Sequence, residues 1–205
     1  MDLMCTDIMS PVAQGAWLAV PIAPQIELSC SNLHVLQNNL VDELPSNSNA
    51  WVVRNLTVGI PVANAEAKRF LDDVASIENF VRVGTSTMWP VWFGGETFQR
   101  RFVSTLRQMS HPRYASEMKL NILLNSRGGS GGDASSSSEL QVQDEAGGRV
   151  APQDVGLGAV VRVDLTVTGM WCSTERCGLR YTVRRVVVAA EPAVACAPEC
   201  LLTED

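Results

Sequence analysis

The residues best suited to chemistry in this sequence lie between Gly158 and Val188, a stretch that is predicted to form two long strands joined by a short turn. In the first arm, valines and Leu165 alternate with polar residues, which is the period-2 pattern of a half-buried strand. The second arm carries arginines on its polar face, and Trp171 and Tyr181 lie near the turn. Arginines beside aromatic rings suit a polyanion with stackable bases, because guanidinium groups neutralise phosphates and rings stack on bases. The same pattern also suits an ordinary sheet edge that is protected by charge.

The charges of the chain are unevenly distributed around a net charge of -6. Residues 1–81 hold nine acidic residues against three basic ones, whereas residues 98–119 hold five basic residues against Glu117 alone. Residues 158–188 hold five arginines against two acidic residues. Two basic segments in an acidic protein can concentrate a positive field on one face. Two solvated faces without any partner would give the same pattern.

Two groups of side chains are therefore candidates for contact with a polyanion. The phosphate-contacting candidates are Arg162, Arg180, Arg184 and Arg185 in the hairpin, and Arg100, Arg101, Arg107, Arg113 and Lys119 upstream of it. The stacking candidates are Trp171 and Tyr181, followed by Trp92 and Phe93. Trp92 and Phe93 also suit a core, since their surroundings are apolar. Trp171 could instead cover the end of a barrel, and the upstream arginines could simply solvate a helix face.

Several further elements must position this hairpin. Alternating apolar residues predict strands over residues 25–36, 51–60 and 114–124, and weaker ones over 16–22 and 139–143. Asn64 is a good N-cap, and apolar residues at helical spacing predict a helix over residues 65–82 that Gly84 ends. A second helix is predicted over residues 96–109, with its phenylalanines on one side.

These elements predict a mainly β fold with α insertions, in which a small closed or partly closed barrel carries two helices and a long C-terminal hairpin. A break in the alternation at Arg184-Arg185 predicts either a β-bulge or a change of exposure in the second arm. The expected organisation is an N-terminal extension (1–24), a single domain (25–188) and an extended acidic tail (189–205). The glycine- and serine-rich residues 125–138 are predicted to form a flexible loop, because they cannot bury apolar surface.

The cysteines offer a metal-binding alternative. Cys172 and Cys177 are separated by four residues, and Cys196 and Cys200 by three, which is within or near the spacing of structural zinc ligands. Four thiolates could then tether the tail to the hairpin. The pairs lack the tight Cys-x-x-Cys form, and cysteines that face each other across a hairpin are common neighbours. The favoured expectation is therefore a protein without metal or other cofactor.

The sequence contains no recognisable catalytic signature. It lacks a Ser-His-Asp arrangement, a His-Glu-x-x-His motif and a phosphate-binding loop, so a non-enzyme is expected. No apolar run approaches the roughly 18 residues that span a bilayer, so no membrane association is expected. Asp2 and Asp7 stand where a secretory signal carries basic residues, which predicts an intracellular protein with reduced thiols.

Residues 51 to 188 also resemble a known family. Trp92-Phe93 follows the first predicted helix, and a Gly-x-x-Val strand begins at Gly158. The most specific part is the hairpin, with the runs Gly169-Met170-Trp171 and Gly178-Leu179-Arg180-Tyr181-Thr182-Val183. This pattern resembles the OB-fold single-stranded DNA-binding proteins of large nucleocytoplasmic DNA viruses, of the African swine fever virus type.

The resemblance implies an OB-like five-stranded barrel that binds single-stranded DNA irrespective of sequence. The process served would be viral DNA replication, recombination or repair, in the host cytoplasm or nucleus. Carried over by position, the aromatic contacts would be Trp92, Phe93, Trp171 and Tyr181. The acidic end, Glu204-Asp205, could dock replication proteins, and the protein could self-associate. The alternative is a protein-interaction or structural module of a virion or scaffold, built on the same barrel without nucleic-acid binding.

Overall fold

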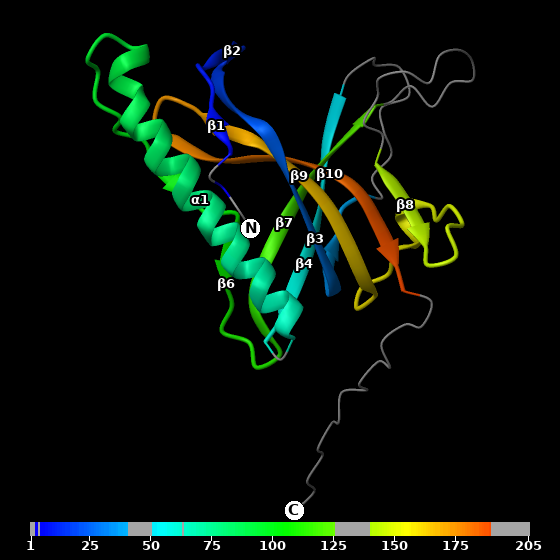
Figure 1. Ribbon diagram of the computed structural model, residues 1–205. Coiled ribbons are helices and arrows are strands. Elements are labelled where there is room, and N and C mark those ends of the chain that lie inside the picture. The colour runs from blue at the N-terminus through cyan, green and yellow to red at the C-terminus, as the bar shows by residue number, and fades with distance from the viewer. Residues whose placement is uncertain (1–2, 4, 41–50, 63, 126–139, 190–205) are drawn as a thin grey trace, which may run out of the picture.

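The computed structural model describes residues 3, 5–40, 51–62, 64–125 and 140–189, which form a mainly β fold with one long helix (Figure 1). The strands are β1 (Asp7–Ile8), β2 (Val12–Gln14), β3 (Trp17–Asn38), β4 (Trp51–Pro61), β5 (Arg101–Val103), β6 (Leu106–Gln108), β7 (Tyr114–Asn125), β8 (Gln141–Asp144), β9 (Val160–Cys172) and β10 (Arg176–Val188). The helices are α1 (Ala65–Trp92) and the short 3-10 helix η1 (Pro152–Asp154). Neither described helix combines the length and the apolar character needed to cross a bilayer.

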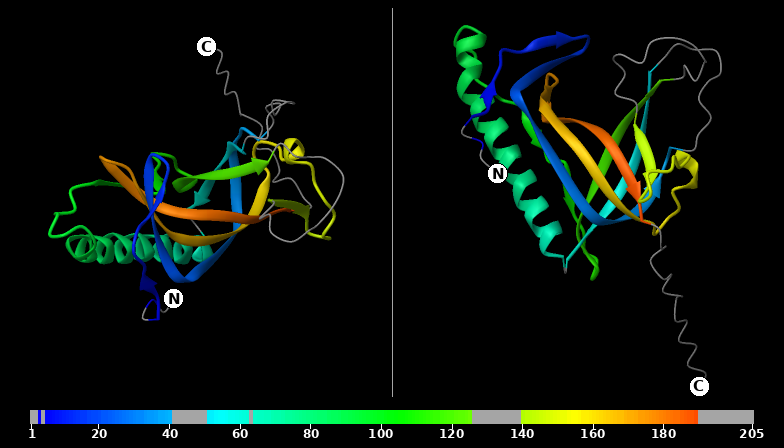
Figure 2. Two further views of the ribbon diagram at one scale, coloured as in Figure 1. Left: turned by 90° about the horizontal axis from the view of Figure 1, so that it is seen from above. Right: turned by 45° about the vertical axis from the view of Figure 1, so that its right-hand side comes forward.

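Five long strands lie side by side in the order β7-β4-β3-β9-β10, and all neighbours in this row are antiparallel. β5 and β8 pair with β10 in parallel, which makes the sheet mixed. The sheet is strongly curved (Figure 2). Its two ends approach where the hydroxyl of Tyr181 on β10 donates a hydrogen bond to the carbonyl of Lys119 on β7. No strand pairing joins β7 to β10 among the described residues, so the predicted barrel is an open sheet.

The predicted hairpin of residues 158–188 is confirmed as β9 and β10. The inward side chains of β9 are buried in the hydrophobic core; they are Val161, Val163, Leu165 and Val167. Arg162, which lies between two of them, is exposed. Alternation therefore separates a core face from a polar face, because successive side chains of a strand point to opposite sides. A shift in pairing between Val183 and Arg185 confirms the bulge predicted there.

β3 is one strand that joins two separately predicted segments, 16–22 and 25–36. It pairs with β9 on both sides of an interruption between Pro21 and Ile26. Pro24, which has no N–H to donate, lies in this interruption. The domain boundary predicted after Pro24 therefore falls within β3.

The helix predicted over residues 65–82 is present, but it continues to Trp92. The side chain of Asn64 caps it as predicted, by accepting hydrogen bonds from N–H groups of the first turn. Gly84 does not end the helix. A Cβ at Gly84 would lie 2.1 Å from the Cδ1 of Ile8, so the absence of a side chain allows β1 to pack closely against α1.

The prediction of a second helix over residues 96–109 is wrong, because this segment is extended and contains β5 and β6. Its phenylalanines have helical spacing, but each meets a different neighbour: Phe98 packs on Trp89 of α1, whereas Phe102 on β5 is the register partner of Cys177 on β10. The carboxylate of Glu78 on α1 accepts a hydrogen bond from the N–H of Thr105 at 2.6 Å. Such tertiary contacts override local helix propensity.

The strands predicted over residues 51–60, 114–124 and 139–143 correspond to β4, β7 and β8. The predicted flexible loop (125–138) and the predicted tail (189–205) lie outside the described residues, apart from Asn125 and Ala189.

Candidate nucleic-acid interface

One surface of the sheet gathers most of the predicted hairpin residues. It is the side of β3, β9 and β10 that faces away from the hydrophobic core, extended by the neighbouring β5, and we call it the arginine face. Its principal side chains, starting near the hairpin turn, are Arg101, Arg176, Trp171, Trp17, Arg180, Arg184, Arg162, Asp164, Arg185 and Ser29. The face thus combines guanidinium groups with two indole rings.

Two tryptophans lie near the hairpin turn of the arginine face. Trp171 lies beside Gly178 of β10, where a Cβ would be 3.0 Å from the indole Nε1. The guanidinium carbon of Arg180 lies 5.4 Å from the ring centroid of Trp17. Both tryptophans remain partly exposed. This end of the face therefore offers rings and a cation to the same ligand.

Two arginines extend this end toward β5. Arg101 and Arg176 are register partners in the parallel pair of β5 and β10, and both are exposed. Neither Arg176 nor Trp17 is among the side chains that the sequence predicts to contact a polyanion. The signal for Trp17 was its alternation with Ala19 and Pro21 in an apolar run, but that run was placed in an N-terminal extension.

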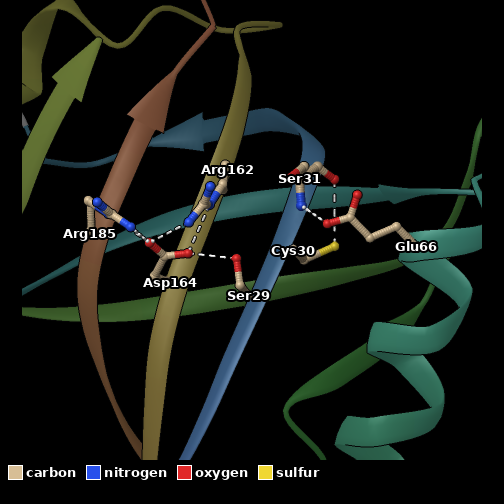
Figure 3. A network of polar contacts seen from close by, with 7 residues as sticks. All are labelled: Ser29, Cys30, Ser31, Glu66, Arg162, Asp164 and Arg185. Atoms are coloured by element: carbon tan, nitrogen blue, oxygen red, sulfur yellow. Dashed lines mark hydrogen bonds and ion pairs between the residues drawn. The ribbon is translucent and has the colours of Figure 1, made fainter. Parts of the chain in front are cut away.

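At the other end of the arginine face, the side chain of Asp164 on β9 links residues of β3, β9 and β10 (Figure 3). Its carboxylate accepts hydrogen bonds from Ser29 on β3 at 2.6 Å, from Arg162 on β9 at 3.1 Å and from Arg185 on β10 at 2.6 Å. Partial burial would raise the pKa of Asp164, but these hydrogen bonds lower it below its usual value. Asp164 is therefore ionised at neutral pH.

An open cavity of about 560 Å³ lies at this end of the face. Its lining includes Glu27, Gln141, Arg162, Asp164, Arg184 and Arg185. The Nε of Arg184 donates to the hydroxyl of Thr166 at 3.1 Å, which holds the guanidinium at the cavity wall. Three guanidinium groups against two carboxylates leave the cavity with a positive balance.

Tyr181 lies on the opposite side of the hairpin from Trp171. Its ring packs against the core, and its hydroxyl bonds to the carbonyl of Lys119 across the seam between β10 and β7. Trp92 and Phe93 pack against the core at the end of α1. The four aromatic residues predicted to stack on bases therefore do not share one surface.

Arg100, which follows α1 in the sequence, packs against the end of that helix and does not lie on the arginine face. Its guanidinium carbon lies 4.1 Å from the ring centroid of the buried Trp89, and its Nε donates to the carbonyl of Ser173 at 2.6 Å. Trp89 also stacks on Phe93 with a centroid distance of 4.2 Å. Arg100 thus ties the turn of the hairpin to the end of the helix.

Replacement of Arg100 by alanine is expected to lower the free energy of unfolding by about 1–2 kcal/mol, because it removes a cation–π contact and a hydrogen bond. Chemical denaturation measures this loss. Arg101→Ala is the matched control, since the side chain of Arg101 is exposed. We expect Arg101→Ala to leave stability within about 0.5 kcal/mol of the wild-type value. Equal stabilities of the two variants would contradict the role of Arg100 in linking the hairpin turn to the end of α1.

The other predicted basic residues lie on the β6 and β7 side of the sheet. Arg107 on β6 pairs with Glu117 on β7 at 3.1 Å and is 83% exposed. Arg113 directly precedes β7, and Lys119 is exposed on β7. These three residues do not contribute to β3, β9 or β10, so the predicted basic set is divided between two parts of the sheet.

An aromatic cluster next to Arg113 was missed by sequence reasoning. The ring of Tyr114 stacks on His111 with a centroid distance of 5.0 Å and meets His34 edge-on at 5.6 Å. Burial and the charge of Arg113 lower the pKa of His34. His34 lies 80 residues before Tyr114 in the sequence, and no local periodicity indicates that these two rings meet.

The cysteines of the hairpin face each other. Cys172 and Cys177 are register partners, and both side chains are buried. A hydrogen bond with Cys177, together with burial, raises the pKa of Cys172. The other two members of the predicted zinc set, Cys196 and Cys200, lie outside the described residues. Within the described part of the chain, no group of three or more potential ligands could hold a metal ion, so the zinc set stays a prediction.

Comparison with known proteins gives a structural likeness only. No protein-family model and no curated protein matches the sequence. The crystal structure of gp2.5, a single-stranded DNA-binding protein of bacteriophage T7, matches with a TM-score of 0.55 at 10% identity, covering 85% of this chain and 91% of that chain. The single-stranded DNA-binding protein of bacteriophage Enc34 matches at 9% identity, with a TM-score of 0.46 (97% and 96% covered) and, in complex with single-stranded DNA, 0.45 (88% and 94% covered). The likeness to gp2.5 shows a shared fold and is consistent with the predicted OB-like fold.

Proposed function

We propose that this protein binds single-stranded DNA, without reading its sequence, on the arginine face. The observation that carries the proposal is the gathering of two partly exposed tryptophans and six arginines on one side of β3, β5, β9 and β10. The T7 protein that shares the fold is itself a single-stranded DNA-binding protein, which supports the same ligand class here.

Base stacking and phosphate contacts would take place at opposite ends of the arginine face. Near the hairpin turn, Trp17 and Trp171 would stack on bases, and each stacked base contributes about 1–3 kcal/mol whatever its identity. At the cavity end, Arg162, Arg184 and Arg185 would meet phosphates and release counterions, which makes affinity fall with salt. Since rings and cations both ignore base identity, the complex would be insensitive to sequence.

We infer a relation to the single-stranded DNA-binding proteins of large DNA viruses of the African swine fever virus type, and a role in viral replication, recombination or repair at the site of viral DNA synthesis. The protein would act without catalysis, on an OB-like barrel completed at the seam between β7 and β10. Its acidic end, Glu204-Asp205, would dock replication proteins.

Fluorescence titration with oligo-dT and with a duplex of equal length tests the proposal directly. We expect quenching of tryptophan fluorescence by oligo-dT, tighter binding of the single strand than of the duplex, and a steep loss of affinity between about 50 mM and about 200 mM salt. No binding at the lower salt concentration would overturn the proposal. Stable oligomers in light scattering would then favour the protein-interaction alternative.

Replacement of Trp171 by alanine is expected to weaken oligo-dT binding by about fivefold to 150-fold, the equivalent of one lost stacked base. Trp171→Phe keeps a ring and should retain most of the affinity. Trp92→Phe is the control, because it alters an indole that packs against the core at the end of α1. Equal affinities of Trp171→Ala and wild type would exclude stacking on Trp171.

A further inference from the structure

We propose that Asp164 is an internal counter-ion of the arginine face, and that it competes with a DNA phosphate for Arg162 and Arg185. This inference rests on the proposed function and assigns the cavity at the end of the face as a phosphate site. The ligand is the phosphodiester backbone of a single strand, and Asp164 occupies the place of one of its phosphates when the protein is free.

The geometry places one carboxylate between two arginines of adjacent strands. Oδ1 of Asp164 lies 3.1 Å from the Nε of Arg162, and Oδ2 lies 2.6 Å from Nη2 and 2.7 Å from Nε of Arg185 (Figure 3). The hydroxyl of Ser29 donates to the same Oδ1 at 2.6 Å. A planar guanidinium holds carboxylate and phosphate oxygens in the same way, so Asp164 and a phosphate are alternative partners.

Burial places the carboxylate behind the cations. The side chain of Asp164 is 18% exposed, whereas those of Arg162 and Arg185 are 46% and 38% exposed. A DNA single strand that approaches from solvent therefore contacts the guanidinium groups before it contacts Asp164. The adjacent cavity gives space for a phosphate and its sugar beside these groups.

Asp164 has two opposite effects on such a ligand. Its hydrogen bonds hold both guanidinium groups in place, which reduces the loss of conformational entropy on binding. Its charge cancels one of the two positive charges, so the protein neutralises about one DNA phosphate fewer in the complex. The charge effect is expected to outweigh the ordering effect at low salt, because the pairing of β9 with β3 and β10 still restrains the backbone that carries Arg162 and Arg185.

The test is Asp164→Asn, which preserves the shape of the side chain and removes its charge. At about 50 mM salt, the variant is expected to bind oligo-dT about eightfold more tightly, and its plot of log K against log salt should be steeper by about 0.7. Glu117→Gln is the matched control, since it breaks the Arg107 ion pair with the same change of net charge. The control should stay within about twofold of wild type.

The possible outcomes separate this inference from the proposed function. If wild type binds no oligo-dT, both are overturned. If wild type binds and folded Asp164→Asn binds equally or more weakly, or if Glu117→Gln gains as much, the counter-ion role is overturned alone. Should Asp164→Asn not fold, the Nε–H resonances of Arg162 and Arg185 in wild-type protein decide the question. They should shift when saturating oligo-dT replaces Asp164 as their partner, and unchanged resonances would overturn the inference.

Discussion

Reversal of the charges of Arg180 and Arg184 together is expected to weaken oligo-dT binding by about two orders of magnitude at low salt. The slope of log K against log salt should also fall by about 1.4, because two phosphate contacts are lost. Neither side chain forms an ion pair with a described carboxylate. Arg180 lies over the ring of Trp17, and Arg184 donates to the hydroxyl of Thr166. Their charge is therefore available to a ligand, and glutamate at both positions would repel the strand.

The control for this double variant is Lys68→Glu with Arg69→Glu. Both residues are exposed on α1, and the change in net charge is the same. We expect the control to bind oligo-dT within about threefold of wild type, since remote surface charges are screened by salt. Equally weak binding by both double variants would mean that net charge, and not the arginine face, governs affinity. Thermal denaturation of each variant checks that folding is retained.

Replacement of Gly169 by alanine is expected to destabilise the protein by about 3–5 kcal/mol. Gly169 has a φ of 140°, a conformation that residues with a side chain rarely adopt. A Cβ at this position would also lie 2.0 Å from the carbonyl oxygen of Val20 on the neighbouring strand. The backbone of β3 or β9 would have to move, which would disturb the centre of the sheet.

Gly158→Ala separates the cost of the positive φ from the cost of the close contact with the neighbouring strand. Gly158 also has a positive φ, of 79°, but no atom outside its immediate neighbours lies within 4 Å of a Cβ built there. Only the conformational cost of about 1–2 kcal/mol is then expected. Urea denaturation of both variants measures the difference. Equal losses would show that contact with Val20 contributes nothing.

The parts of the fold that follow from local pattern were predictable. The alternation around Leu165 indicates a strand with one buried and one polar face, since neighbouring side chains of a strand point to opposite sides. Asn64 indicates where the helix begins, because an N-cap acts within its own first turn. The alternation therefore places Arg162 and Arg180 on the polar sides of their strands from the amino-acid pattern alone.

The parts that depend on distant partners were not predictable. Gly84 resembles a helix stop, but it serves the packing of Ile8, which lies far away in the sequence. Phe98 and Phe102 have helical spacing, but their segment is extended because Phe98 packs against α1 and Phe102 is paired with β10. Arg100 resembles its neighbour Arg101, yet one covers Trp89 and the other is exposed beside the hairpin turn. Residues adjacent in sequence can thus have unrelated roles.

The alternation of apolar and polar residues is enough to define a long hairpin with a polar, arginine-bearing side. Which of these side chains share a surface with residues from other strands depends on the three-dimensional packing of the sheet. It brought Trp17 beside Arg180, and it placed Asp164 between Arg162 and Arg185 as the counter-ion of the face. The physical reason is that periodicity fixes the side of a strand on which a residue lies, whereas the packing of the core fixes the register between strands. That register, which pairs residues more than a hundred positions apart, determines which side chains can meet one ligand.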